Sequence, residues 1–485
     1  MSVNLSEALK IFRPVIGIEV HAQLNTVTKM WCSCEINKNA FENHTVCEIC
    51  SAQPGSLPVL NKKAVELAAK TILAHEGKVN LFSAFDRKNY FYPDLPKGYQ
   101  ITQFFKSIGS DGKMLISINE NENKVIRISK FQLEEDTGKS LHKENYSLIN
   151  LNRCGVPLLE IITAPDMNSA FEAVTYVKAL HANLIYSNVC LGNLQDGNFR
   201  MDVNVSLQKI NETDFGTRVE IKNLNSFKNV EKAIEFEIER QANLLLKDEK
   251  VLQQTLLFNM ESGKTHAIRT KSDADDYRYF PEPDLIPLLV TKDEVAKWQN
   301  ELPELPSKKA DRFMISYGLS HYDAQILCSQ RELANYFEEA VKIYPAGSKK
   351  MANWIISELL HYLNESNKLI TNSPITASNL VGLVKAIDEG IVSGKMAKEI
   401  FIEMYDKSCS ADLIIQQKDL RQNNDSNAIE KIIVDLVLKH PKEVEELKSG
   451  RDRVMGFFVG QVMKQTGGKA NPAVTTELIK KHCGV

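Results

Sequence analysis

Residues 16–24 alternate strictly between apolar side chains and glycine or polar ones, the pattern of a strand that buries one face. Glu19 and His21 fall on the other face, about 7 Å apart along the strand. An acid-bearing face of this kind is typical of a platform for a metal ion and a nucleotide. For this segment alone, an ordinary solvated strand face is an equally good explanation.

Two later segments repeat the alternation and weaken the solvated-face interpretation. Residues 200–207 and 218–222 each place apolar side chains on one face and polar ones on the other. The polar faces carry Arg200, Asp202, Asn204, Ser206, Arg218, Glu220 and Lys222. Mg²⁺ takes oxygen ligands and substrate phosphates, and arginine or lysine neutralises phosphoryl charge. The three segments together predict a sheet surface for magnesium and phosphate.

Acids at two further positions fit the same surface. One strand-like segment ends in three consecutive acids, of which the first two are Glu134 and Glu135. Strict alternation places Glu134 on the polar face, whereas a β-bulge would place Glu135 there, so both stay candidates. Glu160 interrupts an apolar run, where an acid is rarely buried without a partner or a metal. The alternative for Glu160 is a buried ion pair with an arginine such as Arg153.

Four cysteines, Cys32, Cys34, Cys47 and Cys50, form a Cys-x-Cys pair and a Cys-x-x-Cys pair separated by twelve residues. Two such pairs can close a tetrahedral zinc site. Because four sulfur ligands leave no open coordination position, we expect this site to be structural rather than catalytic. The alternative is a loop of four thiols that are buried or redox-active.

The bulk composition excludes several classes of protein. The net charge is −3 and 43% of residues are hydrophobic, so nucleic-acid binding would have to come from a local basic patch. No apolar run reaches the ~18 residues of a membrane span, and the N-terminus lacks a secretory signal. Nine cysteines in 485 residues do not make a disulfide framework and suit a reducing cytoplasm. No Walker A loop is present.

Hydrophobic periodicity predicts the elements that must position these residues. Besides 16–24, the predicted strands are 125–133, 157–162, 200–207 and 218–224. The predicted helices of the same region are 61–75, 169–186 and 228–246. A segment with two prolines and a glycine, 87–99, is predicted as a loop around Lys88. Its aromatic residues, Tyr90, Phe91, Tyr92 and Tyr99, either plug the edge of the core or line a pocket.

Prolines between residues 281 and 306 mark a linker, beyond which the sequence reads as short helices. The last stretch, 448–485, carries seven lysine and arginine residues against two acids, a balance of +5. We therefore predict a first domain over 1–300 with the cysteine loop at 32–50, a helical domain over 301–405 and a helical tail over 406–485.

Several sequence blocks resemble the B-subunit family of glutamine-dependent tRNA amidotransferases. The matching blocks are 16–24, 86–100, 133–140, 151–161, 200–207, 220–227, 275–285, 456–461 and 470–472. They extend over essentially the whole chain. One departure is that Lys271-Ser272 stands where the family usually has Lys-Glu, so the acid of that pair has no counterpart here.

The resemblance implies an α+β fold: an N-terminal cradle domain with a mainly antiparallel, glutamine-synthetase-like sheet, a helical domain, and a helical, YqeY-like tail that binds tRNA. It implies a ligase that uses ATP and Mg²⁺ to phosphorylate the side-chain carboxylate of misacylated Asp-tRNA(Asn) or Glu-tRNA(Gln). Ammonia then forms the amide. In such a cytoplasmic heterotrimer, the A subunit releases the ammonia from glutamine, and the small C subunit joins the other two together.

The same resemblance assigns roles to the candidate residues. Those that would bind or adjoin Mg²⁺ are Glu19, His21, Glu134, Glu135, Glu160, Asp202 and Glu220. Lys88 would approach the phosphates, and the other residues expected at the nucleotide are Arg200, Asn204 and Lys222. The four cysteines would hold zinc, as they do in those relatives that have them.

Two other function classes remain open from the residues alone. One is a zinc-containing tRNA-binding subunit whose acidic sheet is structural, and the other is a free-standing ATP-dependent ligase that acts on a small acid. The sequence also leaves open whether Asp-tRNA(Asn), Glu-tRNA(Gln) or both are substrates.

Overall fold

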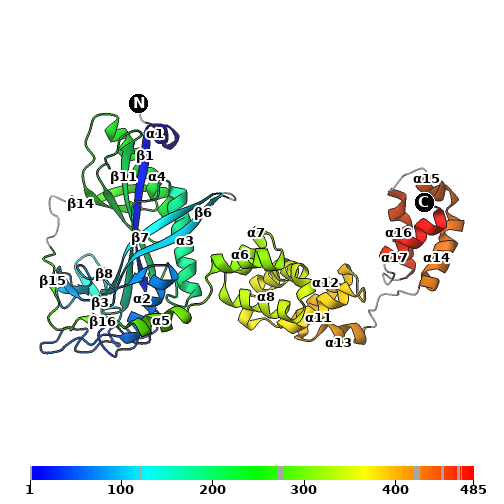
Figure 1. Ribbon diagram of the computed structural model, residues 1–485, viewed down its shortest axis with the longest axis horizontal. Coiled ribbons are helices and arrows are strands. Elements are labelled where there is room, and N and C mark those ends of the chain that lie inside the picture. The colour runs from blue at the N-terminus through cyan, green and yellow to red at the C-terminus, as the bar shows by residue number, and fades with distance from the viewer. Residues whose placement is uncertain are drawn as a thin grey trace. The chain divides into compact units, whose positions relative to one another are not determined.

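The computed structural model describes residues 3–119, 122–270, 277–418, 426–448, 453–466, 470 and 472–484. The chain divides into two compact units, residues 1–305 and 306–485. The first contains sheets and helices, and the elements described in the second are helices (Figure 1). The expected α+β class is confirmed. Lys271 and Ser272 lie outside the described residues.

The main sheet of the first unit has nine strands in the order β14-β13-β12-β11-β1-β10-β7-β6-β2. Neighbouring strands pair antiparallel, except that β12 and β13 are parallel. The bounds are β1 Phe12–Gln23, β2 Lys78–Val79, β6 Gly109–Asn119, β7 Glu122–Glu135, β10 Pro157–Thr163, β11 Phe199–Lys209, β12 Val219–Leu224, β13 Gln254–Asn259 and β14 Lys264–Thr270. The expected antiparallel character is confirmed, and each predicted strand coincides with one of these.

Three long helices share a buried core with one face of this sheet. They are α2 Lys62–Ala74, α3 Ala170–Tyr186 and α4 Phe227–Leu245, with N-caps Asn61, Ser169 and Ser226. Each cap side chain accepts a hydrogen bond from a backbone N–H of the first turn, which fixes where the helix begins. Alternation along β1 places Ile16, Ile18 and Val20 in the core with these helices, so Glu19 and His21 project from the opposite face. The shorter helices of this unit are α1 Leu5–Ile11 and α5 Lys292–Asn300.

The segment predicted as a loop over 87–99 is a loop only in its middle. Its ends belong to strands β4, Asp86–Asn89, and β5, Tyr99–Thr102, which pair with each other. Strand β15, Phe280–Pro281, also pairs with β4. This long-range pairing leaves no local signal, and the prolines and glycine between the strands dominate the pattern. Two further ribbons pair β3 Phe82–Ser83 with β16 Leu288–Leu289, and β8 Lys139–His142 with β9 Ser147–Asn150.

The second unit contains two separate buried apolar clusters among its described residues, spanning 310–415 and 429–483. Its helices are α6 Pro306–Tyr317, α7 His321–Leu327, α8 Arg331–Ile343, α9 Ser348–Trp354, α10 Leu360–Glu365, α11 Ala377–Asp388, α12 Gly394–Lys407, α13 Ala411–Gln417, α14 Ser426–Lys439, α15 Pro441–Lys448, α16 Arg453–Gln465 and α17 Pro472–Cys483. A π-helical turn, Ile355–Leu359, joins α9 to α10. Helix α13 packs in the first of these clusters, and α14 is the first helix of the second. None of the described helices is long and apolar enough to cross a membrane.

Candidate functional site

The register of the central strands brings the predicted polar residues into rows across the sheet. On β1, His21 lies between Arg200 of β11 and Glu160 of β10. One row along, Glu19 lies opposite Asp202. Because cross-strand partners project from the same face, residues far apart in the chain converge on one surface.

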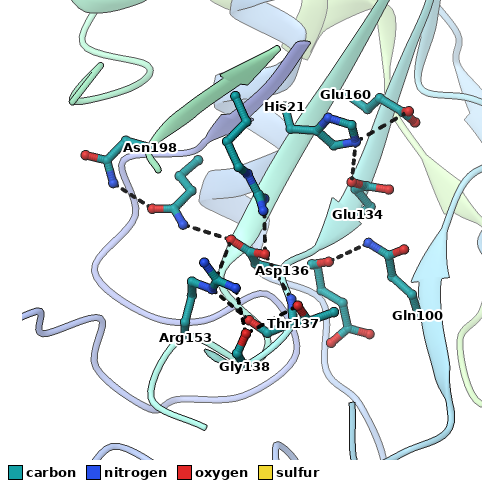
Figure 2. Close-up of polar contacts among 12 residues, drawn as sticks. His21, Gln100, Glu134, Asp136, Thr137, Gly138, Arg153, Glu160 and Asn198 are labelled. Atoms are coloured by element: carbon teal, nitrogen blue, oxygen red, sulfur yellow. Dashed lines mark hydrogen bonds and ion pairs between the residues drawn. The ribbon is translucent and has the colours of Figure 1, made fainter. Parts of the chain in front are cut away.

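The centre of this surface is a group of three possible metal ligands, which we call the acid–histidine cluster: His21, Glu134 and Glu160 (Figure 2). The Nε2 atom of His21 lies 3.4 Å from a carboxylate oxygen of Glu134 and 3.5 Å from one of Glu160. One ligand atom from each of the three lies within 4.8 Å of the others. That spacing lets the three residues share one cation.

Of the two adjacent acids, Glu134 belongs to the cluster and Glu135 does not. No register shift separates β7 from β10 at this point, so plain alternation holds. The Glu135 carboxylate forms an ion pair with Lys97 and accepts a hydrogen bond from the Ile101 N–H at 3.0 Å. The bulge that would have brought Glu135 to the polar face is absent from the described strand. The structure therefore places Glu134, and not Glu135, in the cluster.

A second group of polar residues adjoins the cluster on the side of β11 and β12. The Asn204 amide donates to Glu19 at 2.9 Å. The Lys222 ammonium lies 3.2 Å from Asp202 and 3.0 Å from Glu220. Glu220 also accepts a hydrogen bond from the Thr255 hydroxyl at 2.9 Å. The structure thus brings Glu19 beside the cluster, whereas Asp202 and Glu220 hold a lysine.

Burial sets the protonation of the acid–histidine cluster. It raises the pKa of Glu160, and the charges of Glu134 and Glu19 raise it further. Burial likewise raises the pKa of Glu134. The pKa of His21 is well below its usual value because of burial and the positive charges of Arg200, Lys222 and Lys88. A neutral imidazole is a ready metal ligand, and a divalent cation would supply the charge needed to ionise both acids.

A cavity of about 350 Å³ opens beside this cluster. Six of the site residues predicted from the sequence line it: His21, Lys88, Glu134, Arg200, Asp202 and Lys222. The other lining residues are Tyr90, Gln100, Asp136, Thr137, Leu158, Met201, Leu224 and Asn225. Acids and cations therefore face the same hollow. A smaller cavity of about 210 Å³ lies further along β1, where Glu19, Asn204 and Arg218 line it.

Asp136 is the charged residue among those lining this cavity that the sequence reasoning did not single out. It is 2% exposed and accepts a hydrogen bond from the Gln23 amide at 2.9 Å. The guanidinium of Arg200 lies 3.1 Å from its other carboxylate oxygen. Asp136 is the last of the three consecutive acids that follow the predicted strand. This position beside Glu134 is the feature of the sequence that could have identified it.

Arg153 does not pair with Glu160, so the alternative explanation of Glu160 as a buried ion pair with Arg153 is wrong. The Arg153 guanidinium instead donates to the backbone carbonyls of Thr137 and Gly138, at 2.9 Å and 2.6 Å (Figure 2). It also lies 3.6 Å from Asp136.

Lys88, on β4, lines the cavity, and its ammonium lies near two aromatic rings. Its ammonium lies 4.8 Å from the centre of the Tyr277 ring and 5.9 Å from that of Tyr90. Phe91 and Tyr92 are 76% and 62% exposed, so these two do not plug the core. Of the aromatic segment, Tyr90 is the residue that lines the cavity.

The four predicted cysteines meet in one cluster. Their sulfur atoms lie within 4.8 Å of one another, and Cys50 lies 3.6 Å, 3.7 Å and 3.9 Å from the sulfurs of Cys47, Cys34 and Cys32. A tetrahedron with metal–sulfur bonds of about 2.3 Å has edges of about 3.8 Å. Hydrogen bonds from Cys32 and from the Cys47 amide lower the pKa of Cys50. The residues therefore fit a four-sulfur metal site.

Comparison with known proteins finds matches over nearly the whole chain. Residues 14–296 match the family described as the GatB/GatE catalytic domain, and residues 335–483 match the GatB domain. The chain is 47% identical to the B subunit of the aspartyl/glutamyl-tRNA(Asn/Gln) amidotransferase of Persephonella marina, over 97% of this chain and 99% of that one. The protein of the same name from Thermodesulfovibrio yellowstonii is 48% identical, with the same coverage.

Proposed function

Because the chain belongs to the GatB/GatE family of amidotransferase B subunits, we propose that it activates a side-chain carboxylate on misacylated tRNA. The substrates are Asp-tRNA(Asn), Glu-tRNA(Gln) or both. One carboxylate oxygen attacks the γ-phosphorus of ATP, and ADP leaves. Ammonia then attacks the carbonyl carbon of the acyl phosphate, and phosphate leaves with that oxygen. The products are Asn-tRNA(Asn) or Gln-tRNA(Gln).

The observation that carries this proposal is the acid–histidine cluster at the wall of a cation-lined cavity. A buried carboxyl, a partly buried one and a neutral imidazole would form a ligand set for Mg²⁺, and Glu19 adjoins it. Magnesium, when bound, offsets the charge that builds on the transferred phosphoryl group. No enzyme nucleophile is required, because the substrate carboxylate is the attacking group.

The cations of the cavity act on the phosphates. Lys88 and Arg200 both face the space beside the cluster, so their charges attract and orient the polyphosphate. Lys222 has its ammonium fixed between Asp202 and Glu220, which holds it toward the same space. Asn204 orients Glu19 by hydrogen bonding to its carboxylate.

The four-cysteine cluster holds a structural Zn²⁺ in this proposal. Four thiolates saturate a tetrahedral ion, so the site has no position for a substrate. Its role is to fix the loop over 32–50, because a loop of this length has little apolar core of its own.

Two partner proteins complete the activity. A glutaminase, the A subunit, supplies the ammonia, and the small C subunit joins it to this chain in a heterotrimer. Since the substrate is a tRNA in use by the translation machinery, the cytoplasm is the proposed location.

The experiment that tests this function measures ADP formation by the assembled heterotrimer with ATP, ammonia and each misacylated tRNA. ATP turnover that requires both the misacylated tRNA and Mg²⁺ supports the proposal. A zinc-containing tRNA-binding subunit would give no turnover, and a small-acid ligase would turn over ATP with free aspartate or glutamate and no tRNA.

Truncation after Lys418 tests the role of the tail, which carries the basic balance of +5 over 448–485. The cut spares the first helical cluster, since α13 ends at Gln417. We expect tRNA affinity to fall by about tenfold or more, because several phosphate contacts are lost. Filter binding at fixed salt measures this effect, and a thermal melt checks that the first unit is intact. An unchanged affinity would contradict the assignment of the tail to tRNA.

A further inference from the structure

Hydrogen bonds join the loop that carries the four cysteines, residues 32–50, to a second segment, residues 149–155. Asn152 is one link, since its side chain accepts from the Thr45 N–H at 3.1 Å and donates to the Phe41 carbonyl at 2.7 Å. Asn43 makes the reciprocal pair, because it donates to the Ile149 carbonyl and accepts from the Leu151 N–H. Four side-chain hydrogen bonds thus tie one loop to the other.

Lys29 adds a buried link between the same two loops. It is fully buried, and its ammonium donates to the carbonyls of Thr45 and Leu151 at 2.7 Å and 3.2 Å. The third contact of the ammonium is the sulfur of Cys50, at 3.5 Å. A cation buried in this way needs a negative partner, which a cluster of four metal-bound thiolates would supply.

The 149–155 segment in turn holds the edge of the acid-lined cavity. Arg153 donates to the carbonyls of Thr137 and Gly138. The Gly155 N–H donates to the Asp136 carbonyl at 2.9 Å, and the Asp136 N–H donates to the Val156 carbonyl at 2.8 Å. Asp136 and Thr137 both line the cavity. Hydrogen bonds on the two sides of the 149–155 backbone therefore link the cysteine loop to the cavity wall.

We propose that Asn152 is a positioning residue through which the cysteine loop, when it holds its metal, fixes Arg153 and the Asp136 turn at the cavity. Loss of the metal frees the Phe41 and Thr45 backbone, so Asn152 loses both of these partners and the 149–155 segment loses one of its anchors. The cavity wall then loosens, although the metal lies outside it. The four-sulfur site thereby shapes the cavity without taking part in its chemistry.

Amide hydrogen exchange on the full-length, metal-loaded chain tests the proposal, with Asn152→Ala compared to Asn37→Ala. Asn37 lies in the same cysteine loop, is exposed, and its side chain accepts only from the neighbouring Asn39 N–H. We expect the Asp136 and Gly155 amides to exchange about tenfold faster in Asn152→Ala and at the wild-type rate in Asn37→Ala. Metal content stays the same in both.

Metal removal from the wild-type chain by a chelator provides the second arm. We expect the same acceleration at Asp136 and Gly155, and little further change when the metal is removed from Asn152→Ala. If removal accelerates exchange over 32–50 but leaves these two amides unchanged, the proposal is overturned. This arm also decides the matter should Asn152→Ala fail to fold.

Titration of MgATP gives a third readout, which rests on the proposed function. We expect binding about tenfold weaker in Asn152→Ala and unchanged in Asn37→Ala. Equal affinity in the three chains overturns the link to the cavity. If the wild-type chain itself binds no MgATP, the proposed function fails, and the exchange measurements still decide whether the positioning role holds.

Discussion

Glu160→Gln should lower tRNA-dependent amide formation by about a thousandfold or more, while tRNA binding stays within a few-fold of wild type. Glu160 lies in the acid–histidine cluster, 3.5 Å from His21, and glutamine keeps its shape but cannot carry the negative charge. The charge matters because a divalent cation must be held where phosphoryl transfer takes place. His21→Ala should have a comparable effect. Amide formation is measured by chromatography of the amino acid released from tRNA.

Glu144→Gln is the matched control. Glu144 is exposed, between β8 and β9, so the same chemical change there should leave activity at the wild-type level. Retention of amide formation in Glu160→Gln and His21→Ala would remove the cluster from the mechanism. Equal losses of tRNA binding and activity would instead point to damage of the whole fold.

Cys50→Ser should remove the metal from the cysteine site and lower the midpoint of thermal unfolding by about 10 °C or more. Cys50 contacts the other three sulfurs and Lys29. Without it, the buried Lys29 side chain loses its contact with the Cys50 sulfur. Elemental analysis should find about one zinc per wild-type chain and almost none in the variant.

Cys409→Ser is the control for this change, since Cys409 is a partly buried thiol of the second unit. It should keep both the metal and the unfolding midpoint. A Cys50→Ser chain that retains full metal content would show that the four sulfurs are not the ligands. Unchanged stability after metal loss would contradict the structural role.

The strands of the site were predictable from sequence because alternation survives in them undisturbed. In β1 and β11, apolar residues enter the core and polar ones leave it with a period of two. That pattern identified Glu19, His21, Asp202 and Asn204 as neighbours of a common surface. The four cysteines were predictable for a different reason, since chelation by two short pairs is a local property.

What the sequence left open depended on register and long-range pairing. The choice between Glu134 and Glu135 required the pairing of β7 with β10, because a one-residue shift moves every side chain to the other face. The strand around Lys88 pairs with β5 on one side and, on the other, with β15, nearly 200 residues further along the chain. The contacts of Asp136 also depend on pairing, since two of its partners, Gln23 and Arg200, approach it from β1 and β11.

Isotope transfer tests the central claim, that this surface turns ATP against a carboxyl group. The substrate is misacylated tRNA whose side-chain carboxylate carries a heavy isotope at both oxygens, supplied to the heterotrimer with ATP, Mg²⁺ and glutamine. Mass spectrometry of the released phosphate should find one heavy oxygen for each amide formed, because the attacking oxygen leaves with phosphorus. Amide formation with only ordinary oxygen in the phosphate would contradict the account.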